Sequence, residues 1–174
     1  MKATLAAALG AILVGAPAWA QDGYTLADLI ECHVGQAEYG MMASAIAADP
    51  KAAADYGLAP VESSNAFLAE FAASEPIEAF GKVTSRIAFA SSGILGLFDG
   101  ADVHALAREY AVPATVDTSE KFLGEKVVSE TVEDDADLKM RFRTRIALNI
   151  STVDTHPGIV LAGCTYAVTT EDLP

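Results

Sequence analysis

Apolar and charged positions alternate most regularly between Lys139 and Ile150. Side chains of a β-strand point to opposite faces in turn, so residues two apart share a face. The even positions give a largely apolar face of Met140, Phe142, Thr144, Ile146, Leu148 and Ile150. The odd positions place four cations on the other face: Lys139, Arg141, Arg143 and Arg145. This pattern predicts a strand that buries its even face and leaves the cations in solvent.

Two further strands are predicted beside this one. Valine and threonine become frequent after Pro113, and we expect strands over residues 121–133, 138–152 and 158–169. The acidic segment 134–137 and the segment 153–157 are short enough to join antiparallel neighbours. The apolar residues of the first strand fall on both of its faces, which leaves its register open unless a β-bulge reconciles them.

Before Pro113 the apolar positions recur in steps of three and four, which is typical of helices. We expect helices over residues 25–48 and 50–56, one that carries Phe67, Leu68 and Phe71, a long hydrophobic one over 74–97, and one that begins at Asp99 or Asp102. The expected fold class is α+β, with a helical N-terminal half of four to five helices packed on one face of a three-stranded antiparallel sheet.

The first twenty residues have the pattern of a secretory signal peptide. Lys2 is followed by an apolar run over residues 3–14, and Ala18-Trp19-Ala20 matches a small-x-small cleavage signal. Residue 21 is Gln rather than Cys, which does not support a lipid anchor at the cleavage point. We therefore expect residues 1–20 to be removed and residues 21–174 to form a single α+β domain that is periplasmic or secreted.

The charge of the chain narrows the classes of partner. The formal net charge is −13 at pH 7, and such a surface repels nucleic acid and anionic lipid headgroups. No stretch after the leader is long and apolar enough to span a bilayer. We expect no nucleic-acid binding and no stable membrane association.

Cys32 and Cys164 are the two cysteines of the chain. An exported protein meets an oxidising compartment, which favours a disulfide between them. The alternative is a pair of free thiols with a metal or redox role, but the chain has no Cys-x-x-Cys motif to support it. We predict a Cys32–Cys164 bond that joins the first helix to the last strand.

The row of Lys139, Arg141, Arg143 and Arg145 is the candidate binding site. On an otherwise acidic protein it would form an electropositive strip for an acidic protein partner or a small anionic ligand. The alternative is a solvated sheet face on which Glu125, Glu130 and Glu133 of the preceding strand pair with the cations. Both readings require the odd face of this strand to be exposed.

Catalytic and metal-binding patterns are weak throughout the chain. Cys32 and His33 are adjacent on a helix and diverge too far to share one metal ion, and the acidic segment 134–137 lacks the spacing of a calcium loop. His156 lies in a turn and His104 early in a helix, and the sequence gives neither a partner. No phosphate-binding loop and no dinucleotide motif is present. We predict no catalytic residue, no metal ligand and no cofactor.

These observations favour an exported, non-enzymatic accessory or binding protein that uses the basic row to engage its partner. The alternative is a small periplasmic hydrolase or metal-dependent enzyme with a site near His156 or His33. That alternative requires a pocket in which a histidine meets a carboxylate or a hydroxyl.

Overall fold

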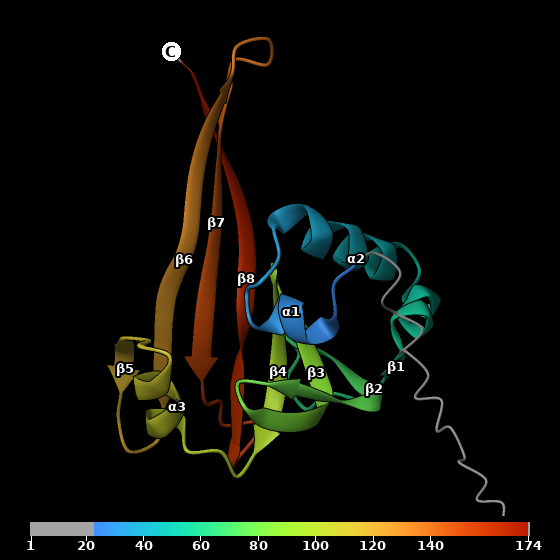
Figure 1. Ribbon diagram of the computed structural model, residues 1–174, viewed down its shortest axis with the longest axis vertical. Helices are drawn as coiled ribbons and strands as arrows, with labels where there is room; N and C mark the ends of the chain where they lie inside the picture. The colour runs from blue at the N-terminus through green and yellow to red at the C-terminus, as the bar shows by residue number, and fades with distance from the viewer. Residues whose placement is uncertain (1–22, 174) are drawn as a thin grey trace, which may run out of the picture.

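The computed structural model describes residues 23–173 and contains one eight-stranded sheet in which every neighbouring pair is antiparallel (Figure 1). The strand order is β1-β2-β3-β4-β8-β7-β6-β5. The strands are β1 (Leu58–Pro60), β2 (Ala69–Ala79), β3 (Lys82–Ala90), β4 (Gly93–Asp99), β5 (Ala114–Asp117), β6 (Phe122–Asp135), β7 (Met140–Ser151) and β8 (Ile159–Asp172). The helices are α1 (Leu26–Ile30), α2 (Gln36–Ala48), the 3-10 helix η2 (Pro50–Tyr56) and α3 (Val103–Glu109).

The expected α+β fold class is wrong, because the long helix predicted over residues 74–97 is instead the end of β2 followed by β3 and β4. Two tight turns separate these strands. Phe80 and Gly81 both have positive φ angles, of 55° and 62°, between the paired residues Ala79 and Lys82. Positive φ at both central residues is the geometry of the two-residue turns that suit the twist of a β-hairpin. The sheet therefore has eight strands rather than three, and the helical pattern concealed β2, β3 and β4.

The helical spacing in this region has a physical explanation. All the residues of β4 from Gly93 to Phe98 are buried, so both faces of the strand are apolar. A strand buried on both faces reads as a continuous apolar run, which contains steps of three and four by chance. The same error applies to Phe67–Phe71, where the structure has a loop that leads into β2.

The helix expected over residues 25–48 is interrupted after Ile30. Cys32 has a φ of 63°, in the left-handed region. The amide of Cys32 donates to the carbonyl of Leu29, and the amide of His33 donates to that of Asp28. This is the Schellman pattern, which usually has glycine in the left-handed position. Cysteine takes that position here, so the helix ends and α2 starts in a new direction.

The predicted short helices at 50–56 and after Asp102 are confirmed. The Asp49 side chain accepts from the amide of Lys51 at the start of η2, and Gly57 closes it with a φ of 69°. The Asp102 carboxylate accepts from the amides of His104 and Ala105 at the start of α3. Both are N-caps of the expected kind.

The three C-terminal strands are also confirmed as an antiparallel unit. β7 pairs with β8 without a break in register from Met140↔Asp172 to Ser151↔Leu161. The pairing of β6 with β7 shifts between Val127 and Ser129, which is the β-bulge that the mixed pattern of the first strand required.

The main core lies between one face of the sheet and the helices. Leu29 and Ile30 of α1, Met42 of α2, and Cys164 and Tyr166 of β8 belong to it. The Cys32–Cys164 disulfide is present, as predicted, with a Cα–Cα distance of 5.3 Å. Near it, the Tyr166 hydroxyl donates to the carbonyl of Leu29 at 2.7 Å. The even face of β8 therefore points toward the helices, as the disulfide requires.

A smaller cluster on the opposite face of the sheet is formed by Ala88, Leu95, Leu97 and Leu161. Leu68 and Val153 pack against it from two loops, 61–68 and 152–158. These loops cover only the end of the sheet near β2, β3 and β4, and the same face of β6, β7 and β8 carries no described helix.

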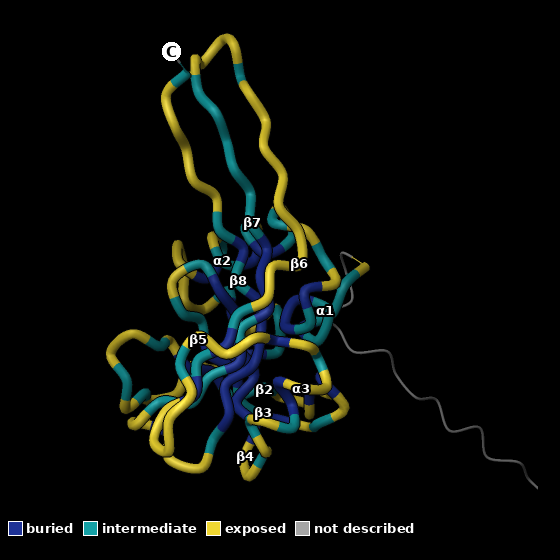
Figure 2. The backbone as a smooth tube through the Cα atoms, turned by 90° about the vertical axis from the view of Figure 1, so that its left-hand side faces the viewer, coloured by how far each residue is buried: buried dark blue, intermediate teal, exposed yellow. Residues whose placement is uncertain are grey.

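The distal parts of β6, β7 and β8 extend well beyond the helices as a three-stranded arm (Figure 1). We define the arm as residues 127–145 and 167–172. Its outer strands are largely exposed and its central strand β7 is half-buried (Figure 2). No described helix packs over the distal end of the arm. Its three strands are therefore held in place by their pairing with one another.

The predicted signal peptide, residues 1–20, lies outside the described residues. Within the described part of the chain, no helix has the length and hydropathy needed to cross a membrane.

Candidate functional site

The face of β7 that carries the arginines is partly exposed from Arg141 to Arg145 and buried at Ala147, and we call it the open face. Strand register assigns its residues. β7 contributes Arg141, Arg143, Arg145, Ala147 and Asn149; β6 contributes Glu125, Val127, Glu130, Val132 and Asp134; β8 contributes Thr165, Ala167, Thr169 and Glu171. The opposite face of β7 carries Ile146, Leu148 and Ile150 into the core. The predicted assignment of faces therefore agrees with the structure.

Each arginine of the open face is bound to a carboxylate of β6. Arg141 donates from Nε and Nη2 to the two oxygens of Asp134 at 2.7 and 2.9 Å. Arg145 donates from both terminal nitrogens to Glu125, at 2.5 and 3.0 Å. Both are two-point contacts, which hold a guanidinium in one orientation. The guanidiniums are thus fixed in place before any partner arrives.

Arg143 is held less firmly than its neighbours. Among the described residues it donates through Nη1 alone, to Glu130 at 2.6 Å. The residue directly across from it on β6 is Val132, which offers no hydrogen bond. Glu130 also lies 4.0 Å from Arg145 and so is shared between two cations. Arg143 therefore retains donors that an added carboxylate could use.

The pairing changes the electrostatics expected of this face. The hydrogen bond from Arg141 lowers the pKa of Asp134, and that from Arg145 lowers the pKa of Glu125. Both carboxyls stay ionised, so three arginines stand beside the four acids Glu125, Glu130, Asp134 and Glu171. The face is a set of neutralised ion pairs, as the paired alternative anticipated, and Lys139 lies apart in the hairpin turn with a φ of 53°.

The β-bulge decides which acids reach the open face. Before the bulge, odd residues such as Glu125 lie on this face, and after it even residues such as Glu130 and Asp134 do. Glu133, one of the three expected partners, pairs instead with Phe142 on the other face. Asp134 takes its place, because a single inserted residue reverses the alternation beyond it.

Aliphatic side chains are exposed on the arm at an unusual density. Five of the nine large hydrophobic residues exposed in the described chain belong to it: Val127, Val128, Val132, Leu138 and Val168, with exposures of 44% to 61%. Single exposed valines are common on protein surfaces. Val127 and Val132 lie on the open face beside the ion pairs, whereas Val168 lies on the opposite face. Exposed apolar side chains on a projecting element beside fixed charges are compatible with an interaction surface.

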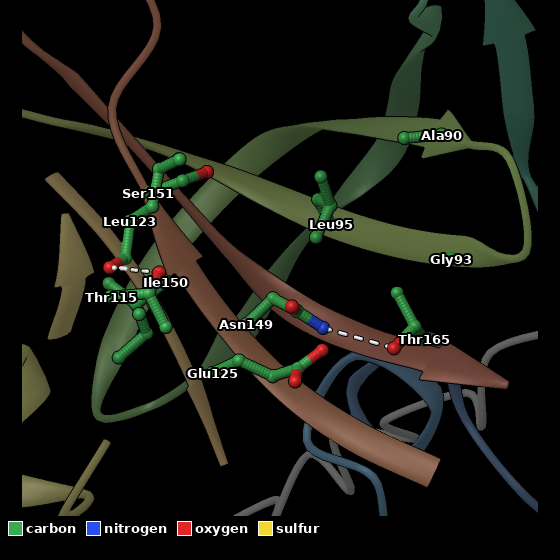
Figure 3. Close-up of a pocket in the computed structure, with 11 residues that line it drawn as sticks. Ala90, Gly93, Leu95, Thr115, Leu123, Glu125, Asn149, Ile150, Ser151 and Thr165 are labelled. Carbon is green, nitrogen blue, oxygen red and sulfur yellow. Dashed lines mark hydrogen bonds between the residues drawn. The ribbon is translucent and has the colours of Figure 1, made fainter. Parts of the chain in front are cut away.

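At the base of the arm the open face forms a groove with a volume of about 410 Å³ (Figure 3). Gly93 and Gly124 belong to its lining, beside Leu95 and Leu123. The Asn149 side chain lies in the middle of the lining and donates to the Thr165 hydroxyl at 3.1 Å. Glu125 lines the groove and also binds Arg145, so the groove and the row of ion pairs are continuous.

A second polar cluster lies under the two loops on the smaller core. His156 and Glu70 are 5% and 2% exposed, and His156 Nε2 lies 2.9 Å from a Glu70 oxygen. Ser63 and Arg86 each donate to Glu70 at 2.5 Å. On the other side of the imidazole, Nδ1 lies 2.9 Å from the Thr155 hydroxyl. The cluster joins loop 61–68, loop 152–158 and strands β2 and β3.

The chemistry of this cluster is that of a satisfied buried ion pair. Burial by itself would raise the pKa of Glu70, but the hydrogen bonds from Ser63, Arg86 and His156 together lower it. A carboxylate with several donors remains charged inside a protein. The cluster also places the Thr155 hydroxyl, the His156 imidazole and the Glu70 carboxylate in one chain of contacts. Nucleophilic hydrolases use these three groups in the same order.

The other histidines are placed less favourably for catalysis. His33 is exposed, with Asp28 and Glu31 at 3.7 and 3.5 Å. His104 lies against the edge of the Phe122 ring, with its Nε2 3.8 Å from Asp117. In the described part of the chain, no three or more His, Cys, Asp or Glu side chains converge in a way that could hold a metal ion.

Sequence reasoning missed Glu70 and Arg86, since both lay in segments read as helical. A signal was present in the strand alternation around them, because Phe71 and Ile87 point into the main core and their neighbours must then point to the other face.

Comparison of the chain with protein-family models, with curated proteins and with solved structures finds no match.

Proposed function

We propose that this chain is an exported, non-enzymatic binding protein whose arm engages a protein partner through the open face. The observation that carries the proposal is the arm itself, a projecting three-stranded element with exposed valines beside a row of fixed ion pairs. Its distal part adds little to the core. An element of this size, ordered without contributing to the core, supports a role in recognition.

The ion pairs favour a protein partner over a simple anion. Arg141, Arg143 and Arg145 already bind carboxylates, so a free anion would have to displace an internal acid. A protein surface with both charges can instead complement the alternating pairs and cover the exposed Val132. The groove at the base of the arm gives such a partner a place for one small side chain.

Site-specific photocrosslinking tests this function and captures the partner in the same step. A photoreactive amino acid is placed at Val132 on the arm or at Val83 on β3, which are 47% and 65% exposed. We expect one defined heterologous adduct from position 132 and none from position 83 in the producing cells. Equal adducts from both positions, or none from the arm, would contradict the proposal.

The captured partner then allows a quantitative test. We expect Arg143→Gln to weaken its binding by about tenfold or more, because an interface arginine orients its partner through several donors. Lys51→Gln, an exposed cation on η2 far from the arm, is the matched control and should leave the dissociation constant unchanged. Thermal unfolding of both variants checks that the fold is retained.

A second candidate function rests on the contact between Thr155, His156 and Glu70. In the tautomer that donates from Nε2 to Glu70, His156 Nδ1 can accept the Thr155 proton. The Thr155 oxygen would then attack an ester carbonyl, and the alcohol would leave with that proton. Water would release the acid from the acyl-threonine and restore the hydroxyl.

Hydrolysis of a p-nitrophenyl ester distinguishes this candidate. If it holds, Thr155→Val and His156→Gln should each lower the rate by about 100-fold or more. Ser64→Ala removes a neighbouring hydroxyl that binds only the Thr155 carbonyl, and it should leave the rate unchanged. Equal rates in the wild type and in all three variants would end the candidate.

A further inference from the structure

The free edge of β8 on the arm carries a further inference. β4 covers this edge as far as the pair Gly93↔Thr165, and the amide of Tyr166 still donates to the carbonyl of Ser92. Beyond Tyr166, no described strand lies on the side of β8 away from β7. Backbone groups alternate in direction along a strand, so Val168, Thr170 and Asp172 present their N–H and C=O groups to this open side.

The far end of β8 shows the same alternation. The amide of Leu173, an odd position, donates to the carbonyl of Lys139 in the β7 hairpin turn. Odd positions therefore face β7, and even positions face outward. Val168, Thr170 and Asp172 thus offer three N–H donors and three C=O acceptors to a further strand beside β8.

The two edges of the arm are protected to different degrees. β6 has the β-bulge at Val128, and Lys126 close to it, both of which discourage pairing with another chain. β8 has neither a bulge nor a proline nor a lysine between Ala167 and Asp172, and its register with β7 is unbroken. Val168, Thr169 and Thr170 are β-branched residues in an unbroken strand, which makes this segment a good template for a further strand.

We propose that this edge of β8 pairs antiparallel with the same edge of a second copy of the chain, about a two-fold axis at Thr170. Thr170 would face Thr170 of the second copy, and Val168 would face Asp172. All these residues have outward-facing backbone groups, so the pairing forms six hydrogen bonds. The two arms become one six-stranded sheet, closed by symmetry.

Charge complementarity selects the second copy in this orientation. On the open face, Glu171 of one copy lies opposite Thr169 of the other, and Thr169 is the β8 neighbour of Arg143. Arg143 has a single carboxylate partner among the described residues. Glu171 of one copy and Arg143 of the other would lie two inter-strand spacings apart. Their two long side chains together can span this distance. A parallel arrangement would instead place Glu171 and Asp172 beside the same acids of the second copy.

Sedimentation equilibrium of the purified mature protein tests the dimer. We expect a monomer–dimer equilibrium that Thr170→Pro weakens by about tenfold or more, because proline removes the outward N–H while an edge strand tolerates it. Val168→Glu should weaken the dimer similarly, since it places a second carboxylate directly opposite Asp172 of the other copy. Val128→Glu, on the other outer strand and 49% exposed against 44% for Val168, is the matched control and should leave it unchanged.

The test has clear contrary outcomes. A wild-type protein that stays monomeric up to about 1 mM would overturn the proposal. So would a Val128→Glu variant that dissociates as readily as Val168→Glu, because the contact would then not be the β8 edge. Neither result bears on the heterologous adduct from position 132, so the dimer and the proposed binding function are judged separately.

Discussion

Among single residues, Glu70 is the one whose charge is most tightly coupled to the fold. It is buried to 2% exposure and accepts hydrogen bonds from a serine, an arginine and a histidine. Removing one member of a buried charge pair leaves the other without compensation. The network holds two loops on the sheet, and we expect the stability of this end of the molecule to depend on it.

Glu70→Gln should lower the free energy of unfolding at pH 7 by about 3 kcal/mol. The pKa of Glu70 is lowered in the fold, so its carboxylate contributes stability above pH 4.5 that is lost as the pH falls through the lowered value. The difference in the free energy of unfolding between the wild type and Glu70→Gln should therefore become smaller below pH 4.5. Urea unfolding across this pH range measures it, with the exposed Glu62→Gln as control. A gap independent of pH would contradict the assignment.

At the scale of single elements, the tight turns decide where strands begin and end. The Phe80-Gly81 turn needs two positive φ angles, and the Glu31 side chain accepts from the Phe80 amide at 2.5 Å. Gly40 lies in α2 with ordinary helical geometry. Gly81 is therefore suited to its position by its positive φ, whereas the backbone at Gly40 would accept any residue with a helical φ.

Gly81→Ala should destabilise the protein by about 1 kcal/mol, because an L side chain is strained at a φ of 62° even though no atom lies within 4 Å of the added Cβ. Gly40→Ala should instead stabilise α2 by up to about 1 kcal/mol. Its added Cβ meets only the flexible end of Gln36, at 3.1 Å. Chemical denaturation measures the change in the free energy of unfolding for both variants. A change of the same sign in both would refute the argument.

The arm should open locally more readily than the rest of the sheet. Thr131 and Val132 on β6 and Thr169 on β8 are exposed, whereas Ala147 and Leu148 of β7 are buried. Hydrogen exchange followed by mass spectrometry should show faster exchange for residues 129–145 than for residues 146–151. At protein concentrations that favour the dimer, the amides of Val168 and Thr170 should become protected. Uniform exchange along β7 would contradict this account.

In the whole molecule, one covalent bond joins the first helix to the middle of the sheet. Cys32 and Cys164 are 132 residues apart, so their bond restricts almost the entire described chain. Tyr39 stacks on Tyr166 beside it, with 4.7 Å between ring centroids, and burial raises the pKa of Tyr39 to about 12. The N-terminal helices thus close over β8 at a single, well-packed point.

The double variant Cys32→Ala, Cys164→Ala should lose about 5 kcal/mol of stability, as expected for a closed loop of this length. Unfolding in urea, compared with the oxidised wild-type protein, measures the loss. Reduction should reproduce most of the effect without the change of side chain. A loss below about 1 kcal/mol would show that the bond restricts the unfolded chain little.

The sequence predicted the C-terminal half of this fold well. The alternation in β7, the outward arginines and the disulfide follow from local patterns or from pairing the two cysteines available, whereas the register of β6 was left open. The predictions at Asp49 and Asp102 were confirmed for the same reason, since a cap depends on the next three residues.

Tertiary structure decided what local pattern left ambiguous. β4 is buried from Gly93 to Phe98 because it lies between β3 and β8 with both faces covered, and no local period distinguishes such a strand from a buried helix. The pairing of each arginine depended on one inserted residue in β6, and the buried Glu70–His156 contact joins segments 86 residues apart. Alternation along a chain is set by the bonding geometry of each residue, whereas burial on both faces and long-range ion pairing exist only once the strands have found their neighbours.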